Sequence, residues 1–470
     1  MRKREIFSAA AALVWLLLMI ILYYAGHKPA EPGQLAGLAQ SAWRLLATTG
    51  LTLLAGGLGR RILKLDELPP LVRLALQAGL GFGLLSIGVL AVGSSLGLPA
   101  WLPWAAWLGL SLLMFRPILA WLREWHALAE LWSASGAFER LLASLLGIIF
   151  LGALAVALAP PTHYDTLVYH LALPDTYLRV GRVSYLPWLM SWGMPQGAEL
   201  LYTWAAGLGG IETGALMGWC FGLVAMVGLL GWLSQVFDAR AAWVAAAALL
   251  GGLTPVVVLS SAYVEWLVFL QALGGLILLL EWVRSGRISR LALAGLFCGL
   301  AVGSKYTSAV LAAAGVVLLA WQLRRQPRLF LRQAFIFGGT ALLAASPWFL
   351  KNLLATGNPL HPLFFNSGSV TAVSIKVYQG VQPFGDWLDI LFLPLRATML
   401  GFEAGPGYMF DSGWLLAGLG GLLGWMPAGT MARRPRPGPK PGQTILARLC
   451  CAAQRSWRSA GCWSGSSATS

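Results

Sequence analysis

Long apolar runs separated by short polar stretches dominate the pattern of the chain. Uncharged or nearly uncharged runs recur at roughly 7–25, 41–58, 71–95, 101–120, 141–159, 211–236, 241–262, 264–283, 291–304, 306–322, 332–349 and 412–427. Such runs, as helices rising 1.5 Å per residue, suit a hydrocarbon layer of ~30 Å. Barrel strands are excluded, because the runs are too long and lipid offers no water to unpaired backbone groups. The pattern therefore predicts an all-α polytopic membrane protein with about twelve transmembrane helices.

Composition agrees with a bilayer environment. Of the 470 residues, 58% are hydrophobic and only 11% are charged, and the mean hydropathy is +0.70. A water-soluble protein is excluded, because a globular surface needs more charge to stay solvated. The opening stretch "MRKREIFSAAAALVWLLLMIILYYAG" has features of a signal peptide but no convincing small-residue cleavage site, so we expect it to be the first span.

The net charge of +15 describes membrane orientation rather than nucleic-acid binding. Basic residues cluster on alternate connections: before the first span, between spans two and three, between four and five, and again at 240, 284–290 and 324–332. By the positive-inside rule these connections are cytoplasmic. We therefore expect a multi-pass protein of the cytoplasmic (inner) membrane with a cytoplasmic N-terminus. Loops 160–210 and 351–410 and the turns at 263–265 and 304–306 are then external.

Ionisable residues gather on this predicted external face. The first large loop opens with "HYDTLVYH", which contains Asp165 and His170, while Glu265 and Lys305 lie in the next external turns. Because all of them lie at one depth, where a bundle would have its outer cavity, we expect them to converge. A positioned carboxylate can act as a general base, and Asp165 is the strongest candidate because it directly follows the end of a span.

Four stretches carry a resemblance to a known family. They are "YDTLVYHLALPDTYLRVG", "SSAYVEWLVFLQALGGLILL", "GLFCGLAVGSKYTSAV" and "KNLLATGNPLHPLFF". Their order and spacing, over about residues 141–365, resemble the polytopic glycosyltransferases of the GT-C class. The similarity is greatest to the protein mannosyltransferase-like and aminoarabinose transferase-like bacterial branch. It implies a GT-C-like fold whose external first large loop carries short helices.

The resemblance also implies an activity. Such enzymes move a sugar, hexosyl or pentosyl, from a polyprenyl-phosphate carrier to a lipid, glycan or protein acceptor on the external face of the membrane. Asp165 matches the family's acidic residue in the first external loop, and Glu265 matches the second acid, although Asp is more usual there. The expected partners are a lipid-linked sugar donor, membrane lipids and the acceptor, and no nucleic acid.

Eight residues form the expected site. Asp165 and Glu265 are expected to be catalytic, and the substrate-binding residues are expected to be Lys305, Tyr306, Tyr169, His170, Arg182 and Lys351. The lysines end apolar helices at the external surface, where a lysine contacts phosphate or snorkels to headgroups. Glu265 has three open roles: orienting the acceptor, sharing a metal with Asp165, or pairing with Lys305. No metal site is expected, since "HxDxxxxH" is not a metal-ligand spacing, and whether a divalent cation takes part stays open.

The chain departs from the resemblance at both ends. Four spans precede the acidic loop where the family usually has one, so we expect an N-terminal four-span bundle at 1–140 before a core at 141–427. Residues 428–470 form a basic segment, expected to be a disordered tail or the product of a truncated or frame-shifted reading.

A transporter or flippase is the main alternative, because about twelve spans is also typical of carriers. Carriers tend to hold polar groups near the bilayer midplane, whereas here the ionisable residues lie at one face. The chain has no P-loop and no GxGxxG phrase, which favours a lipid-linked donor over a nucleotide bound from the cytoplasm.

Overall fold

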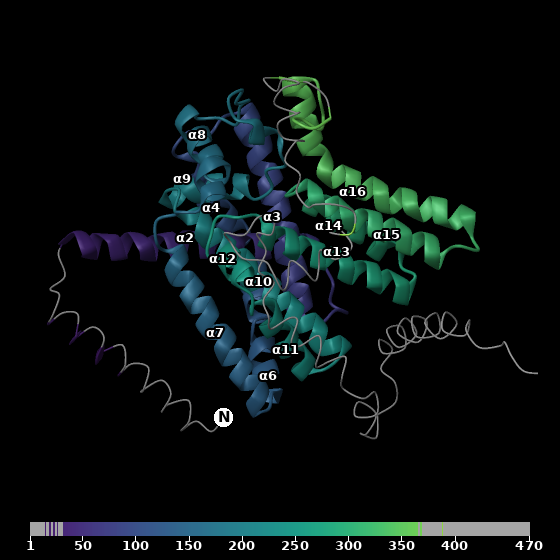
Figure 1. The fold of residues 1–470 in the computed structure, drawn as a ribbon, viewed down its shortest axis with the longest axis horizontal. Helices are drawn as coiled ribbons and strands as arrows, with labels where there is room; N and C mark the ends of the chain where they lie inside the picture. The colour runs from purple at the N-terminus through teal and green to yellow at the C-terminus, as the bar shows by residue number, and fades with distance from the viewer. Residues whose placement is uncertain are drawn as a thin grey trace, which may run out of the picture.

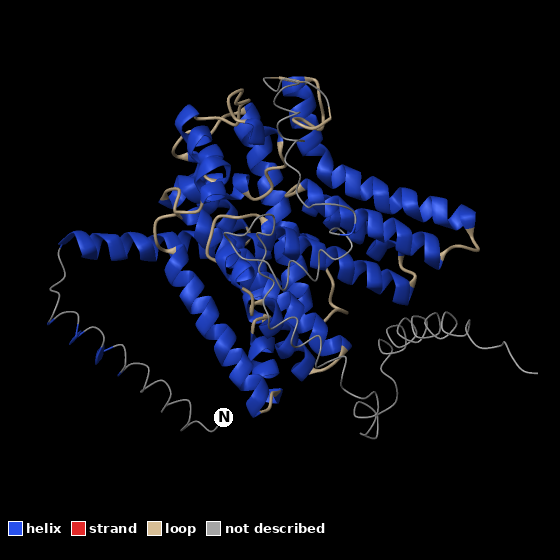
Figure 2. Cartoon of the chain, viewed as in Figure 1, coloured by secondary structure: helices blue, strands red, loops and turns tan. Residues whose placement is uncertain are grey.

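The computed structural model describes residues 32–364, together with residues 15, 18, 19, 22, 23, 26, 367, 368 and 388. This part of the chain is built from helices and turns, and no strand occurs in it (Figure 2). The fold class predicted from the sequence, an all-α polytopic membrane protein, is confirmed. The predicted spans 7–25 and 412–427, most of the loop 351–410 and the tail 428–470 lie outside the described residues.

The helices follow one another along the chain without long gaps (Figure 1). Their bounds are α2 (Pro32–Ile62), α3 (Pro70–Ser95), α4 (Leu102–Leu113), α5 (Phe115–Arg123), α6 (His126–Ala134), α7 (Ala137–Ala157), α8 (Ala172–Val180), α9 (Glu199–Gly209), α10 (Thr213–Val236), α11 (Ala239–Leu249), α12 (Leu253–Leu259), α13 (Glu265–Ser285), α14 (Ile288–Val302), α15 (Ala309–Gln322) and α16 (Pro327–Thr356). Three short helical turns complete them: Thr166–His170, Met190–Gly193 and Tyr306–Ser308. The predicted short helices of the first large loop are thus present.

Five of these helices, α3, α7, α10, α13 and α16, are long and apolar enough to cross a membrane, and the number rises to seven if each of two bent pairs is one span. The predicted count of twelve is not confirmed. The bends interrupt the predicted runs 101–120 and 241–262, by 70° between α4 and the helices after it and by 85° between α11 and α12. Proline explains the first bend, because the ring of Pro117 would clash with the carbonyl of Leu113, where α4 ends.

The N-terminal helices share a core with those that follow. Helix α3 packs against α2, α10 and α13, and α14 packs between α13 and α16. In Figure 1, α13, α14, α15 and α16 extend together to the right of the central helix α3. The predicted division of the chain at residue 140 stays a prediction, although α3 contributes Phe82 to the same buried cluster as Phe221 of α10.

Alternate connections meet at one end of the bundle. The α3–α4 turn joins the large loop through hydrogen bonds from Leu98 N to Gly181 O (2.6 Å) and from Val183 N to Gly93 O (2.9 Å). The hydroxyl of Tyr202 in α9 donates to the carbonyl of Tyr263 before α13 over 2.6 Å. These are the connections that the charge pattern assigns to the external side.

The basic connections meet at the other ends of α3 and α13. There Glu67 pairs with Arg287 and Arg290, and Glu124 pairs with Arg60 and Arg73. The two groups of connections are therefore separated as the sequence pattern predicts. Which group faces the cytoplasm stays a prediction.

Candidate active site

A wide helical turn opens the candidate site. Asp165 is followed directly by the π-helical turn Thr166–His170, in which Leu171 N donates to Thr166 O over 2.8 Å. Turns of this kind are rare in proteins, and those that occur are often found at functional sites. The turn ends with two aromatic side chains in contact, because the rings of Tyr169 and His170 lie 4.0 Å apart.

The charges of three carboxylates reach the phenol of Tyr169, and we call Asp165, Glu199 and Glu265 the carboxylate cluster. Burial, followed by the negative charges of Asp165, Glu199 and Glu265, raises the pKa of Tyr169 well above its usual value. The three acids come from separate elements: the start of the π-helical turn, the start of α9 and the start of α13. The turn that follows Asp165 lies near the residues before Glu265, because the ring centres of His163 and His170 lie 6.2 and 5.5 Å from that of Tyr263. The phenol of Tyr169 remains a hydrogen-bond donor at neutral pH.

Glu265 is paired with Lys305. The Nζ atom of Lys305 lies 2.6 Å from Oε1 of Glu265, and the two side chains are 43% and 40% exposed. Of the three roles that the sequence left open for Glu265, pairing with Lys305 is the one the geometry shows. In the part of the chain that the structure describes, no trio of His, Cys, Asp or Glu side chains is placed to hold a metal ion.

Asp165 differs from Glu265 in having no hydrogen-bond or ion-pair partner among residues 32–364. Its side chain is half-buried beside the exposed Tyr164. Lys305 neutralises one acid of the carboxylate cluster, whereas Asp165 keeps its oxygens available. A carboxylate that is partly desolvated and unpaired is suited to accept a proton.

The third acid, Glu199, was not among the residues expected from the sequence. Its Oε1 atom lies 2.7 Å from Nδ1 of His170, and the two side chains are only 4% and 3% exposed. The signal was available in "PQGAELLYTW", because an acid that opens an apolar helix is costly unless it is paired. The same criterion singled out Glu265.

Lys351 and Tyr306 hold the neighbouring loop. The Nζ atom of Lys351 donates to the carbonyl of Trp192 and lies 3.7 Å above the centre of its indole ring. The hydroxyl of Tyr306 donates to Gly193 O over 3.3 Å, and the amide of Asn352 donates to the same carbonyl over 2.7 Å. The turn Met190–Gly193 is thereby fixed against α16.

Arg182 lies away from the carboxylate cluster. Its guanidinium donates to the carbonyl of Ser94 at the end of α3, at 3.4 Å and in an exposed position. The neighbouring Arg179 pairs with Asp175 on the surface of α8, at 3.0 Å. The structure therefore brings together Asp165, Tyr169, His170, Glu265 and Lys305 of the predicted set, with Tyr306 and Lys351 at the adjoining loop, and it does not bring Arg182 to them.

Comparison with known proteins gives a match to one family model, over part of the chain. Residues 209–350, from the end of α9 into α16, match the model of the dolichyl-phosphate-mannose-protein mannosyltransferase family. This match confirms the resemblance to GT-C-type glycosyltransferases, and it supports a membrane glycosyltransferase of the mannosyltransferase type. The matched segment contains Glu265 and Lys305, whereas Asp165, His170 and Glu199 precede it. No curated protein and no solved structure matches the chain.

Proposed function

We propose that this protein transfers a hexosyl or pentosyl group from a polyprenyl-phosphate-linked donor to a lipid, glycan or protein acceptor, at the external face of the cytoplasmic membrane. The observation that carries the proposal is the contact of the turn around the unpaired Asp165 with Tyr263, which precedes the pair-forming Glu265 by two residues. The family match over residues 209–350 supports sugar transfer as the reaction class.

The site offers a group for each part of the reaction. Asp165 takes the proton of the acceptor hydroxyl or amine while that atom forms its bond to the anomeric carbon of the sugar. The bond between the anomeric carbon and the phosphate oxygen breaks, and its electron pair leaves with the phosphate. Lys305, oriented by Glu265, supplies positive charge to the departing phosphate. Tyr169 can donate a hydrogen bond to the substrate from its protonated phenol.

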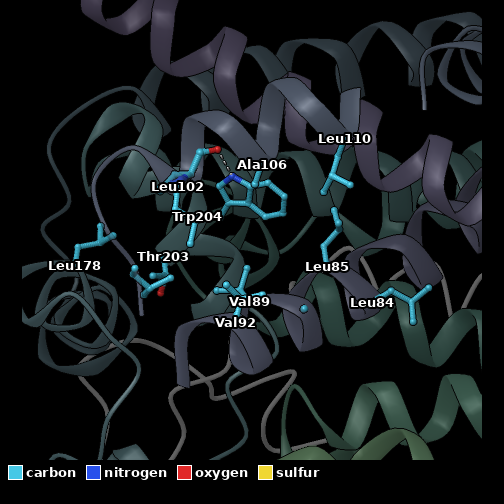
Figure 3. A pocket seen from close by; sticks show the side chains of 13 residues that line it. Leu84, Leu85, Val89, Val92, Leu102, Ala106, Leu110, Leu178, Thr203 and Trp204 are labelled. Carbon is cyan, nitrogen blue, oxygen red and sulfur yellow. Dashed lines mark hydrogen bonds between the residues drawn. The ribbon is translucent and has the colours of Figure 1, made fainter. Parts of the chain in front are cut away.

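An apolar cavity near the site suits the chain of a lipid-linked donor. The cavity has a volume of about 200 Å³ and lies between α3, α4, α8 and α9 (Figure 3). Its lining is almost entirely apolar, with Leu85 and Val89 from α3, Ala106 from α4 and Trp204 from α9 among the residues labelled in Figure 3. A cavity with an apolar lining favours an apolar occupant.

The cavity is close to the carboxylate cluster along α9. Thr203 lines the cavity, and its hydroxyl donates to the carbonyl of Glu199 one helical turn earlier, over 2.8 Å.

Reconstitution into liposomes separates the proposal from the transporter alternative. Purified protein receives a radiolabelled polyprenyl-phosphate sugar and an acceptor extract, and covalent transfer is measured beside movement of the intact donor between leaflets. The proposal predicts labelled acceptor with release of polyprenyl phosphate. Movement of the donor with no labelled acceptor would instead support a flippase.

A further inference from the structure

We propose that Glu199 is a positioning residue for the transfer reaction, because its bond to His170 fixes the π-helical turn that carries Asp165 and Tyr169. This inference rests on the proposed function, since it concerns the same site. Neither the sequence pattern nor the matched segment 209–350 assigns a role to Glu199.

Burial makes the bond between Glu199 and His170 obligatory. A buried carboxylate is strongly destabilising unless hydrogen bonds replace its lost hydration. The one hydrogen bond that Glu199 Oε1 makes within the described chain is from Nδ1 of His170, at 2.7 Å, and Oε2 is buried there without a partner. When Glu199 is ionised it can only accept, so Nδ1 of His170 donates, and the bond holds the imidazole in one orientation.

The position of His170 along the turn explains how this bond affects the orientation of Asp165. His170 is the last residue of the π-helical turn, and Asp165 immediately precedes the turn. A π-helical turn contains one residue more than an α-helical turn, so loss of the wide turn would rotate the side chains before it by about 100° relative to those after it. Fixing His170 therefore fixes the direction in which Asp165 points.

The other end of the bond is tied to the second half of the site. Gly197, two residues before Glu199, donates from its backbone to the carbonyl of Gly303 over 3.0 Å. The next residue, Ser304, donates its hydroxyl to Gln271 of α13 over 3.0 Å. Gly197 is required by this approach, because an added Cβ would collide with Ser304.

These contacts connect the elements that carry the proposed site residues. Ser304 precedes Lys305, and Gln271 lies on the helix that begins with Glu265. The bond between His170 and Glu199 thus joins the element that carries Asp165 to the elements that carry the Glu265 and Lys305 pair. Breaking it separates the proposed base from the proposed phosphate contact without removing either.

Three variants test the inference in the transfer assay: Glu199→Ala, Glu199→Gln and His170→Ala. We expect Glu199→Ala and His170→Ala to lower kcat ~10- to 100-fold with KM changed less than about threefold, because the reacting groups are present but misplaced. Glu199→Gln keeps an oxygen that accepts from Nδ1 and should retain kcat within about threefold. The double variant Glu199→Ala/His170→Ala should be no slower than either single one, since the two residues act as a unit.

Glu139→Ala is the matched control for loss of a buried, paired acid. Glu139 is 7% exposed and pairs with Arg240 at 2.6 Å, at the end of α7 opposite the large loop. Its removal should lower thermal stability and leave kcat per folded protein unchanged. The inference is overturned if Glu199→Ala keeps wild-type kcat, if Glu199→Gln is as slow as Glu199→Ala, or if activity falls only in step with the folded fraction.

A second measurement does not depend on turnover. Asp165→Cys is introduced into a chain whose five native cysteines are serine, and the rate at which a maleimide labels the introduced thiol is measured with and without Glu199→Ala. The inference predicts a labelling rate at least about fivefold different, and an equal rate contradicts it. If the wild type transfers no sugar, the proposed function fails, and the labelling rate alone decides whether Glu199 holds the turn.

Discussion

Individual carboxylates of the site are distinguished by their partners. The charges of Asp165, Glu199 and Glu265 all contribute to the raised pKa of Tyr169, yet Glu265 pairs with a lysine, Glu199 pairs with a histidine, and Asp165 has no partner among the described residues. The oxygens of Asp165 are therefore bonded by no described side chain and are available to an acceptor group. The proposed assignment of roles follows from this difference.

Lys305→Ala tests the proposed phosphate contact. We expect the rate of transfer to fall ~10²-fold, because a preorganised positive group stabilises charge as it develops on the phosphate. The stability of the folded protein should change by only ~0–1 kcal/mol, since the pair with Glu265 is partly exposed. Activity and thermal unfolding of the purified variant are the measurements.

Lys64→Ala is the control for Lys305→Ala, because Lys64 is an exposed lysine between α2 and α3, at the other end of the bundle. It should leave the rate unchanged. Equal activity of Lys305→Ala and Lys64→Ala would remove Lys305 from the site.

The sequence predicted only some of the individual residues of the site. Asp165 and Glu265 were found because acids at the ends of apolar runs are unusual, and the charges of both contribute to the raised pKa of Tyr169. Glu199 was missed because the pairing of residues 29 positions apart depends on how α9 packs against the loop. Lys351 was expected to bind substrate, which stays a prediction; in the structure its Nζ atom contacts Trp192.

Single helices show where hydropathy overestimates a span. The runs 101–120 and 241–262 are apolar throughout, yet each is broken into two helices at a sharp bend. Hydropathy indicates that a segment is apolar, but it does not indicate whether the segment forms one straight helix or bends. The second break falls at Gly251 and Gly252, just before Pro255, so the local residues explain what the apolar pattern conceals.

Filling the apolar cavity tests whether it receives the donor chain. Ala106→Phe on α4 places a ring in the cavity, and we expect KM for a long-chain donor to rise ~10-fold with kcat little changed, because binding is lost equally from ground state and transition state. The increase should disappear with a donor whose isoprenoid chain is too short to reach the cavity. Donor titrations with both chain lengths provide the measurement.

Ala105→Phe is the matched control for this variant. Ala105 is the neighbouring alanine on α4, but it is exposed and does not line the cavity. Its KM should stay at the wild-type value for both donors. A KM for Ala106→Phe that equals that of Ala105→Phe would show that the cavity takes no part in donor binding.

At the scale of the whole molecule, the sequence predicts well which connections lie at each end of the helical bundle. Alternating basic and apolar segments predicted which connections lie together, and hydrogen bonds between those connections bear this out. The rotation of each helix about its axis and the lateral order of helices depend on side-chain packing, so α3 and α10 could not be placed side by side from hydropathy alone. The family match covers residues 209–350, which include α10, α13 and α14.

Reporter fusions test the orientation. A reporter that is active only outside the cytoplasm, fused after Gly209, should be active, and the same reporter fused after Arg287 should be silent, because the basic connections remain in the cytoplasm. A cytoplasm-dependent fluorescent reporter should give the opposite pattern. Both positions reporting the same side would contradict the topology and the external location of the proposed site.

The most direct test of the proposed function compares Asp165→Asn with Asp175→Asn in the transfer assay. Both changes remove one negative charge and preserve size, but Asp175 is paired with Arg179 on the surface of α8, whereas Asp165 has no partner among the described residues. With one lipid-linked sugar and equal amounts of folded protein, Asp165→Asn should lower the rate of transfer ~10²- to 10⁴-fold, as expected for loss of a positioned base. Asp175→Asn should stay within about threefold of the wild type. Equal rates for the wild type and Asp165→Asn, with Asp175→Asn inactive, would contradict the assignment of Asp165 as the base.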